Sequence, residues 1–266
     1  IHKINFNVNN KLREKIVEVA KSKYIGEQTS SDIIQSFADR SEDLKKVVIH
    51  DLLKYFTKTL TNLKREYHNI NTNIFDYLGN YAEGPTLADL SPMPPSGVAD
   101  SLINETTETR DNLRVGSVEV ERDARDVTIY LSARYKPEDE DAYETDRWGY
   151  TETDLEPAMT FSGLDDAQAA LIKAFVPHAV DEAGGFAGFR ETATKTNSLV
   201  DRLEALTLPR LADVEDGLER YINAVERAEE LEAKIEKTDR LIDEIVYELY
   251  GLTEEEIEIV EEAVDG

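Results

Sequence analysis

Two long stripes of apolar side chains, each spaced for one side of a helix, constrain the fold of this chain most strongly. The first stripe begins after Ser41, repeats at intervals of three and four residues, and ends before Gly79. The second begins at Leu211 and continues in the same way to Leu249. Such a stripe is stable only when it packs against another apolar surface. We therefore expect long helices over residues 41–79 and 207–250.

The two expected helices are similar in length, so packing them on each other would bury both stripes. The predicted fold is mainly α: a long antiparallel two-helix coiled coil with an inserted small α+β head that contains a β-hairpin. The alternative is that one stripe faces a partner domain or a second copy of the chain. Gly217 lies inside the second helix, where glycine costs about 1 kcal/mol relative to alanine.

The head is expected to follow a linker over residues 80–97, whose prolines prevent a helix from passing through it. An α+β insert is predicted over residues 98–206. Its clearest element is the hairpin, because apolar and polar residues alternate over residues 113–122 and again over residues 127–135.

Shorter helices are predicted around these elements. Residues 1–40 read as N-terminal short helices, and residues 97–109 are compatible with another. A helix over residues 165–176 has Ser162 and Asp165 spaced as a capping box and is interrupted by Pro177. Residues 192–206 predict one more helix before the second long stripe.

The C-terminal residues 251–266 predict a short helix that is separated from the long one. Gly251 can end the long helix in the left-handed conformation, and Thr253 with Glu256 has the spacing of a capping box. The stretch over residues 241–262 resembles the terminal segment of adenine-specific DNA methyltransferases and Type IIG restriction-modification enzymes. The resemblance implies a longer polypeptide with an upstream methyltransferase domain that uses S-adenosylmethionine. In it, this chain would be the C-terminal region.

The net charge of −26 falls almost entirely on residues 81–266. So acidic a surface is typical of proteins that stay soluble in molar salt, where the Debye length falls to about 3 Å. We expect a halophilic, haloarchaeal type of source, with an acidic protein of ordinary cytoplasm as the alternative. The chain has no cysteine, no apolar run that could span a membrane and no signal-peptide pattern, so a cytoplasmic location is expected. Because residue 1 is isoleucine, we expect a fragment of a longer polypeptide or a processed chain.

Motifs for catalysis and for metal binding do not match in this chain. The double proline at Pro94 and Pro95 lacks the flanking residues of an adenine-methyltransferase loop. The glycine-rich residues 184–188 follow a predicted helix rather than a strand, and the acidic residues 137–146 lack the spacing of a calcium loop. Glu232 and Lys234 have the Glu-x-Lys spacing of magnesium-binding nucleases. That motif lies on a strand, whereas these residues lie within a predicted helix. We therefore expect no catalytic residue, metal ligand or cofactor in this chain.

Contact with DNA requires basic side chains gathered on one surface, because affinity comes largely from neutralising phosphates. The candidates are Lys54, Lys58, Lys64 and Arg65 on the first long helix, and Arg114, Arg122, Arg125, Arg134 and Lys136 on the hairpin. The basic residues of the helix could instead form a solvated polar face, and the hairpin arginines could read a groove of DNA. Trp148, Tyr143 and Tyr150 could anchor the acidic loop or stack on bases, and core packing is the favoured interpretation.

Two functions follow from these observations. The resemblance implies a non-catalytic helical spacer or clamp that supports target DNA recognition by a methyltransferase or restriction-modification enzyme. The alternative is a coiled-coil scaffold or adaptor that binds another protein through its β-containing head.

Overall fold

The computed structural model describes residues 42–138, 143–182 and 194–265, and these residues belong to two compact units. One unit is Thr72–Asn223. The other contains the described residues up to Asn71 and those from Ala224 onward. The expected short helices within residues 1–40 lie outside the described residues. None of the described helices is long and apolar enough to cross a membrane.

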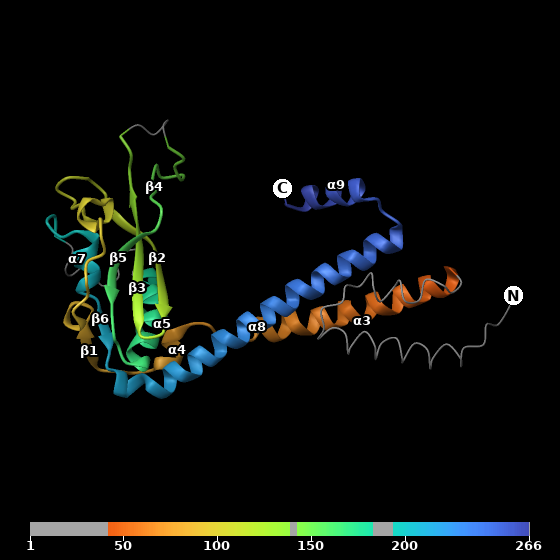
Figure 1. The fold of residues 1–266 in the computed structure, drawn as a ribbon, viewed down its shortest axis with the longest axis horizontal. Coiled ribbons are helices and arrows are strands. Elements are labelled where there is room, and N and C mark those ends of the chain that lie inside the picture. Colours follow the sequence, from red (N-terminus) through yellow and green to blue (C-terminus); the bar gives the residue numbers. More distant parts are fainter. Residues whose placement is uncertain (1–41, 139–142, 183–193, 266) are drawn as a thin grey trace. The chain divides into compact units, whose positions relative to one another are not determined.

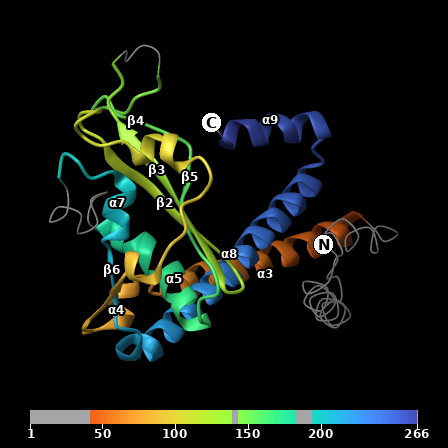
Figure 2. The ribbon, with the colours of Figure 1, turned by 60° about the vertical axis from the view of Figure 1, so that its left-hand side comes forward.

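The helical unit contains α3 (Glu42–His68), most of α8 (Leu211–Tyr250) and α9 (Glu254–Asp265). Helices α3 and α8 lie side by side and run antiparallel (Figures 1 and 2). Two ion pairs connect the helices. Arg227 of α8 contacts Glu66 of α3 at 2.5 Å, and Asp239 of α8 contacts Lys64 of α3 at 3.0 Å. The following apolar residues of the two helices are buried: Ile49, Leu52, Phe56, Leu231 and Ile245.

The α+β unit is built on a four-stranded antiparallel sheet whose centre is β3 (Asp126–Tyr135). Strand β3 pairs with β2 (Arg114–Asp123), β4 (Thr151–Glu152) and β5 (Glu156–Phe161) (Figure 2). Helix α5 (Asp166–Glu182) packs on β2 and β3, and its buried residues include Ile172 and Val176. The hairpin expected from alternating apolar residues is therefore confirmed.

A second, two-stranded sheet joins the two ends of this unit. Strand β1 (Glu83–Thr86) pairs with β6 (Thr207–Pro209) just before α8 begins. An added Cβ on Gly84 would approach the Pro209 carbonyl oxygen to 2.8 Å, so only glycine fits this pairing. Residues 80–97 are therefore not a linker, and residues 207–209 do not belong to the long helix.

The expected fold class is wrong. Thr72–Asn223 is the larger of the two units and contains two sheets, so a mainly α coiled coil with a small inserted head does not describe the chain. Much of the buried apolar surface belongs to strands and α5 rather than to two helical stripes. The stripe pattern led to this error because its spacing continues across an interruption of the helix.

That interruption lies after His68, where α3 ends. A separate helix, α4 (Ile74–Leu78), begins after Asn73, whose side chain accepts a hydrogen bond from the Phe75 amide. Asparagine side chains compete with helical hydrogen bonds and favour caps. The predicted single helix over residues 41–79 is therefore two helices, which belong to different units.

Three shorter predictions also need correction. Helix α5 continues through Pro177 to Glu182, and its capping pair is Asp165 with Gln168 rather than Ser162 with Asp165. Proline removes the hydrogen bond to the carbonyl of Lys173, an exposed residue, so water can replace that bond. Helix α7 is only Leu199–Glu204, and residues 97–109 contain 3-10 turns at Val98–Asp100 and Leu102–Asn104 instead of a helix.

The C-terminal prediction is confirmed. Helix α8 ends at Tyr250, and Gly251 adopts a φ of 66°, in the left-handed region. The Thr253 hydroxyl accepts from the Glu256 amide at 3.4 Å, and the Glu256 carboxylate accepts from the Thr253 amide at 2.9 Å. This reciprocal pair starts α9.

Candidate nucleic-acid interface

A group of basic and aromatic side chains lies where β2, β3 and β4 meet the loop that follows β3. Tyr150 is 8 % exposed and forms its centre. The charged ends of Arg114, Arg134 and Lys136 lie 4.8, 5.1 and 5.1 Å from the centre of the Tyr150 ring. We call this group the basic–aromatic cluster: Arg114, Arg134, Lys136, Arg147, Trp148 and Tyr150.

Strand pairing explains why three of these cations meet. Arg114 begins β2 and is directly opposite Arg134 near the end of β3. Lys136 follows β3 immediately. The aromatic face of Tyr150 carries partial negative charge, which stabilises the nearby cations.

Asp146 holds the loop of the cluster in place. Its carboxylate accepts hydrogen bonds from the Trp148 and Tyr150 amides at 2.8 and 3.0 Å, and it pairs with the guanidinium of Arg134. The amide of Tyr150 chiefly, with Trp148 and Arg134, lowers the pKa of the Asp146 carboxyl below its usual value. Asp146 is therefore ionised at neutral pH and orients both the backbone and one cation.

The loop also exposes two large aromatic rings. Trp148 is 58 % exposed, and the guanidinium of Arg147 lies 3.7 Å from its ring centre. Tyr143 is 51 % exposed and packs edge-on against Tyr135. The expectation that Trp148 serves core packing is wrong, because this residue is largely exposed. Exposed rings beside cations can stack on nucleic-acid bases while the cations neutralise phosphates.

The remaining two hairpin candidates are at the opposite end of β2 and β3. Arg122 contacts Asp166 at 2.9 Å and donates to the Ala124 carbonyl oxygen at 2.8 Å. Arg125 donates to the carbonyl oxygens of Leu164 and Gly163 at 2.5 and 3.2 Å. These arginines connect the hairpin turn to the segment that leads into α5. The structure therefore brings Arg114, Arg134 and Lys136 together, and leaves Arg122 and Arg125 apart.

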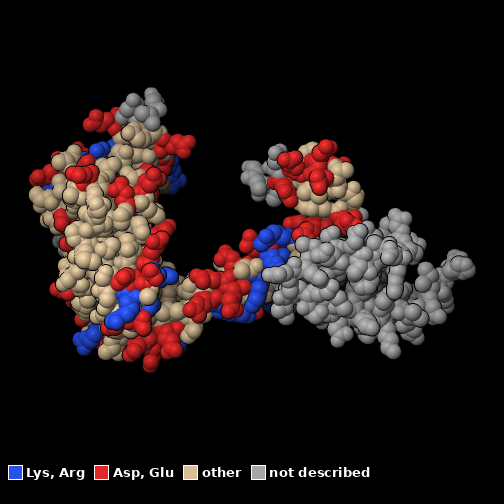
Figure 3. All heavy atoms as spheres, viewed as in Figure 1, with Lys and Arg blue, Asp and Glu red and all other residues tan. Residues whose placement is uncertain are grey.

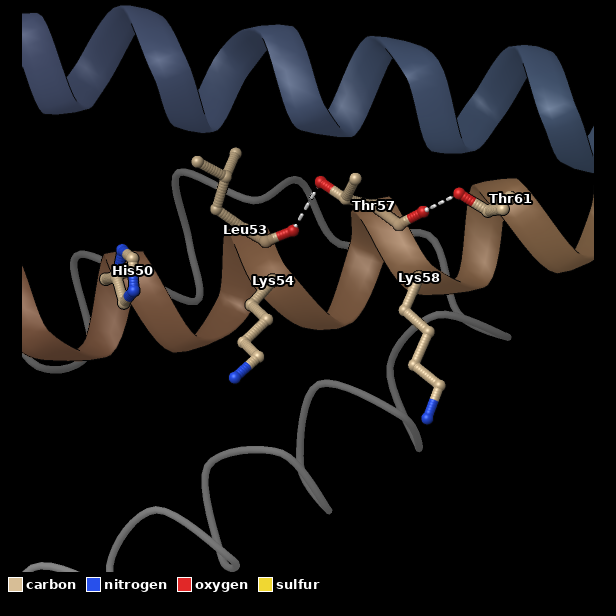
Figure 4. A pocket seen from close by; sticks show the side chains of 6 residues that line it. All are labelled: His50, Leu53, Lys54, Thr57, Lys58 and Thr61. Atoms are coloured by element: carbon tan, nitrogen blue, oxygen red, sulfur yellow. Dashed lines mark hydrogen bonds between the residues drawn. The ribbon is translucent and has the colours of Figure 1, made fainter.

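The four α3 candidates belong to the helical unit. Lys54 and Lys58 line a shallow hollow on α3 together with Leu53, and Figure 4 shows the two lysines pointing to the same side of the helix. Leu53 points the other way, and its carbonyl oxygen accepts from the Thr57 hydroxyl at 2.8 Å. The other two candidates have partners: Lys64 pairs with Asp239, and Arg65 donates to Asn62 at 3.1 Å.

No catalytic arrangement emerges among the described residues. His178 contacts the Tyr221 hydroxyl at 2.7 Å, whereas Ser117 donates to the Glu152 carboxylate at 2.7 Å. Ser117 and His178 therefore hydrogen-bond to other side chains. The described ranges also contain no group of histidine and acidic side chains that could hold a metal ion. The glycine-rich residues 184–188 lie outside the described residues.

Sequence reasoning missed Arg147 as a member of the basic–aromatic cluster. Its position beside Trp148, in a stretch with other aromatic residues, was the available signal. The chain has 56 acidic and 30 basic residues, and Figure 3 shows acidic side chains over much of α9. Comparisons with protein-family models, curated proteins and solved structures find no match.

Proposed function

We propose that this chain is a non-catalytic, nucleic-acid-binding segment that contacts DNA through the basic–aromatic cluster. The observation that carries the proposal is the convergence of Arg114, Arg134 and Lys136 on Tyr150, beside the exposed Trp148. Cations supply the electrostatic part of DNA affinity, and an exposed indole supplies stacking. Both are present in a chain whose net charge of −26 otherwise repels DNA.

The resemblance of residues 241–262 extends this proposal to a parent protein. In that proposal the chain is the C-terminal helical spacer or clamp of an adenine-specific DNA methyltransferase or Type IIG restriction-modification enzyme. S-adenosylmethionine would be bound by the upstream methyltransferase domain. A cytoplasmic location and a halophilic source belong to the same proposal, and the acidic composition supports the second.

A DNA-binding titration of the full chain from low to molar KCl tests the proposal. Trp148→Ala should weaken binding by about tenfold, since stacking contributes roughly 1–3 kcal/mol per base. Lys136→Ala should reduce the slope of log affinity against log salt by about 1, since one phosphate contact is lost. Circular dichroism at each salt concentration checks that the chain is folded.

The matched control is Arg240→Ala. Arg240 is an exposed arginine of α8 that contacts Glu236 at 3.7 Å and does not belong to the cluster. Its replacement should leave DNA affinity unchanged. If all three variants weaken DNA binding equally, general charge rather than the cluster accounts for affinity, and the proposal fails.

The alternative function, a scaffold or adaptor that binds another protein, is favoured by one observation. Helix α9 exposes Ile259 and Val260, and Tyr250 at the end of α8 is 74 % exposed. Neighbouring exposed apolar residues, such as Ile259 and Val260, can take part in a protein interface. No measurable DNA affinity at any salt concentration would favour this alternative.

A further inference from the structure

A hollow in the α+β unit, separate from the one on α3, adjoins the basic–aromatic cluster. It has a volume of about 260 Å³ and lies between the segment before β2 and the segment before α7. Three of the residues that line it are cations, Arg114, Lys195 and Arg202. The uncharged lining residues include Thr107, Asn112 and Thr194, and no aspartate or glutamate is among the described lining residues.

Arg202 is the unusual member of this group because it is only 2 % exposed. Its Nη2 donates to the carbonyl oxygens of Thr194 and Asn197 at 3.4 and 3.2 Å. Its Nε is buried and has no hydrogen-bond partner in the part of the chain that the structure describes. Burial lowers the pKa of the guanidinium, and the nearby Asp201 opposes that shift only in part.

A buried cation with an unused donor is costly unless an anion or an acceptor compensates it. Carbonyl oxygens supply partial charge only. Asp201 is already engaged, because its carboxylate accepts from the Ser198 amide at 2.8 Å in the capping box of α7. The described residues that line the hollow therefore include three cations and no carboxylate.

The two segments that form the hollow are connected through their backbones. The Glu108 amide donates to the Lys195 carbonyl oxygen at 3.1 Å. Asn112 adopts a φ of 64°, so the chain turns sharply just before β2 begins. Thus the cations come from segments far apart in sequence and are held at one place.

We propose that this hollow binds a phosphate oxyanion through Arg202, Lys195 and Arg114. The unesterified oxygens of a phosphate group can accept several charge-assisted hydrogen bonds at once, which matches a site with three cations and neutral donors. The source of the phosphate, a nucleic-acid backbone, rests on the function proposed above. Arg114 supports that source because its guanidinium also lies over the ring of Tyr150, so the hollow and the cluster share one side chain.

Inorganic phosphate is the probe for the test, titrated into the full chain at constant ionic strength set with KCl. The Nε–H resonance of Arg202 in a nitrogen–proton spectrum should shift and saturate. Lys195→Glu should weaken phosphate binding by at least about tenfold, because it replaces a charge-assisted contact with repulsion. Lys195 is exposed, so its replacement should leave the fold intact.

The matched control is Lys173→Glu, an equal change of charge at an exposed position on α5 outside the hollow. It should retain wild-type affinity for phosphate. The proposal is overturned if the Arg202 resonance does not move, or if Lys195→Glu and Lys173→Glu weaken binding equally.

A DNA oligonucleotide, added to the phosphate-saturated chain, separates the two proposals. Displacement of phosphate, seen at the Arg202 resonance, supports a nucleic-acid backbone as the occupant. If phosphate binds but the oligonucleotide does not displace it, a nucleic-acid backbone is not the occupant, and the hollow is a site for free phosphate. If DNA binds and depends on Trp148 while neither ligand moves the Arg202 resonance, the hollow is not a phosphate site although the proposed function stands.

Discussion

The two ends of the β2–β3 hairpin carry arginines that are used in different ways. At the turn, Arg122 and Arg125 donate to backbone carbonyl oxygens, and Arg122 also pairs with Asp166. At the open end, Arg114 and Arg134 lie over an aromatic ring, and Lys136 remains exposed. Only the open end brings several cations onto one aromatic ring.

The difference shows that equal charges in one element need not have equal roles. A guanidinium that donates to backbone carbonyls stabilises the turn, but those donors are no longer available to a ligand. A guanidinium over a ring has its charge stabilised by the partial negative charge of the ring face. The turn end should therefore influence stability, and the open end should influence binding.

The largest expected effect on stability comes from Arg125→Met at the turn end. The change removes the hydrogen bonds to Leu164 and Gly163 and should cost about 1–2 kcal/mol of unfolding free energy. DNA affinity should not change. Urea unfolding of this variant and of Lys136→Met, which should lose little stability, checks the contrast. The comparison fails if Lys136→Met proves the less stable of the two.

A smaller effect is expected from Asp146→Asn at the open end. The pKa of the Asp146 carboxyl is lowered from 3.8 in the folded chain, so ionised Asp146 stabilises the fold above that value. The contribution is lost as pH falls through the lowered pKa. The variant should therefore be less stable than wild type at neutral pH, and the gap should narrow in acid.

Urea unfolding between neutral pH and pH values below 3.8 measures this dependence. Glu119→Gln, an exposed carboxyl change on β2, is the control and should show no such narrowing. A gap that stays constant or widens in acid would show that Asp146 does not hold the cluster through its charge.

The smallest effect is expected from Lys54→Ala and Lys58→Ala on α3. Both side chains are exposed and lie outside the cluster, so each should change DNA affinity by less than about twofold and stability by less than about 0.5 kcal/mol. Titrating each variant with DNA, and comparing its affinity with that of Lys136→Ala, checks this expectation. A loss as large as that of Lys136→Ala would extend the interface to the helical unit.

Part of this fold could be predicted because its signals are local. The alternation of apolar residues identified the hairpin, and the glycine and capping box after α8 identified the start of α9. The sheet formed by β1 and β6 had no such signal, because β1 is four residues long and includes Gly84 and Pro85. Its pairing depends on a partner more than a hundred positions away.

The candidate site divides in the same manner. The sequence identified Arg114, Arg134 and Lys136 as basic residues of a hairpin, since strand register follows from alternation and turn position. It gave no reason to separate them from Arg122 and Arg125, whose partners include the first residue of α5 and the segment before it. Nor did it indicate Arg202, which becomes a buried cation only through packing.

The sequence by itself determined the helical spacing of α8, its glycine stop, the hairpin and the acidic balance, because each depends on neighbours along the chain. Tertiary structure decided which cations meet, and it explains the glycine at position 217. In helix propensity alone Gly217 is unfavourable. In the fold, an added Cβ would lie 3.0 Å from the carbonyl carbon of Tyr77 and overlap its oxygen, so the close approach of two distant segments requires glycine.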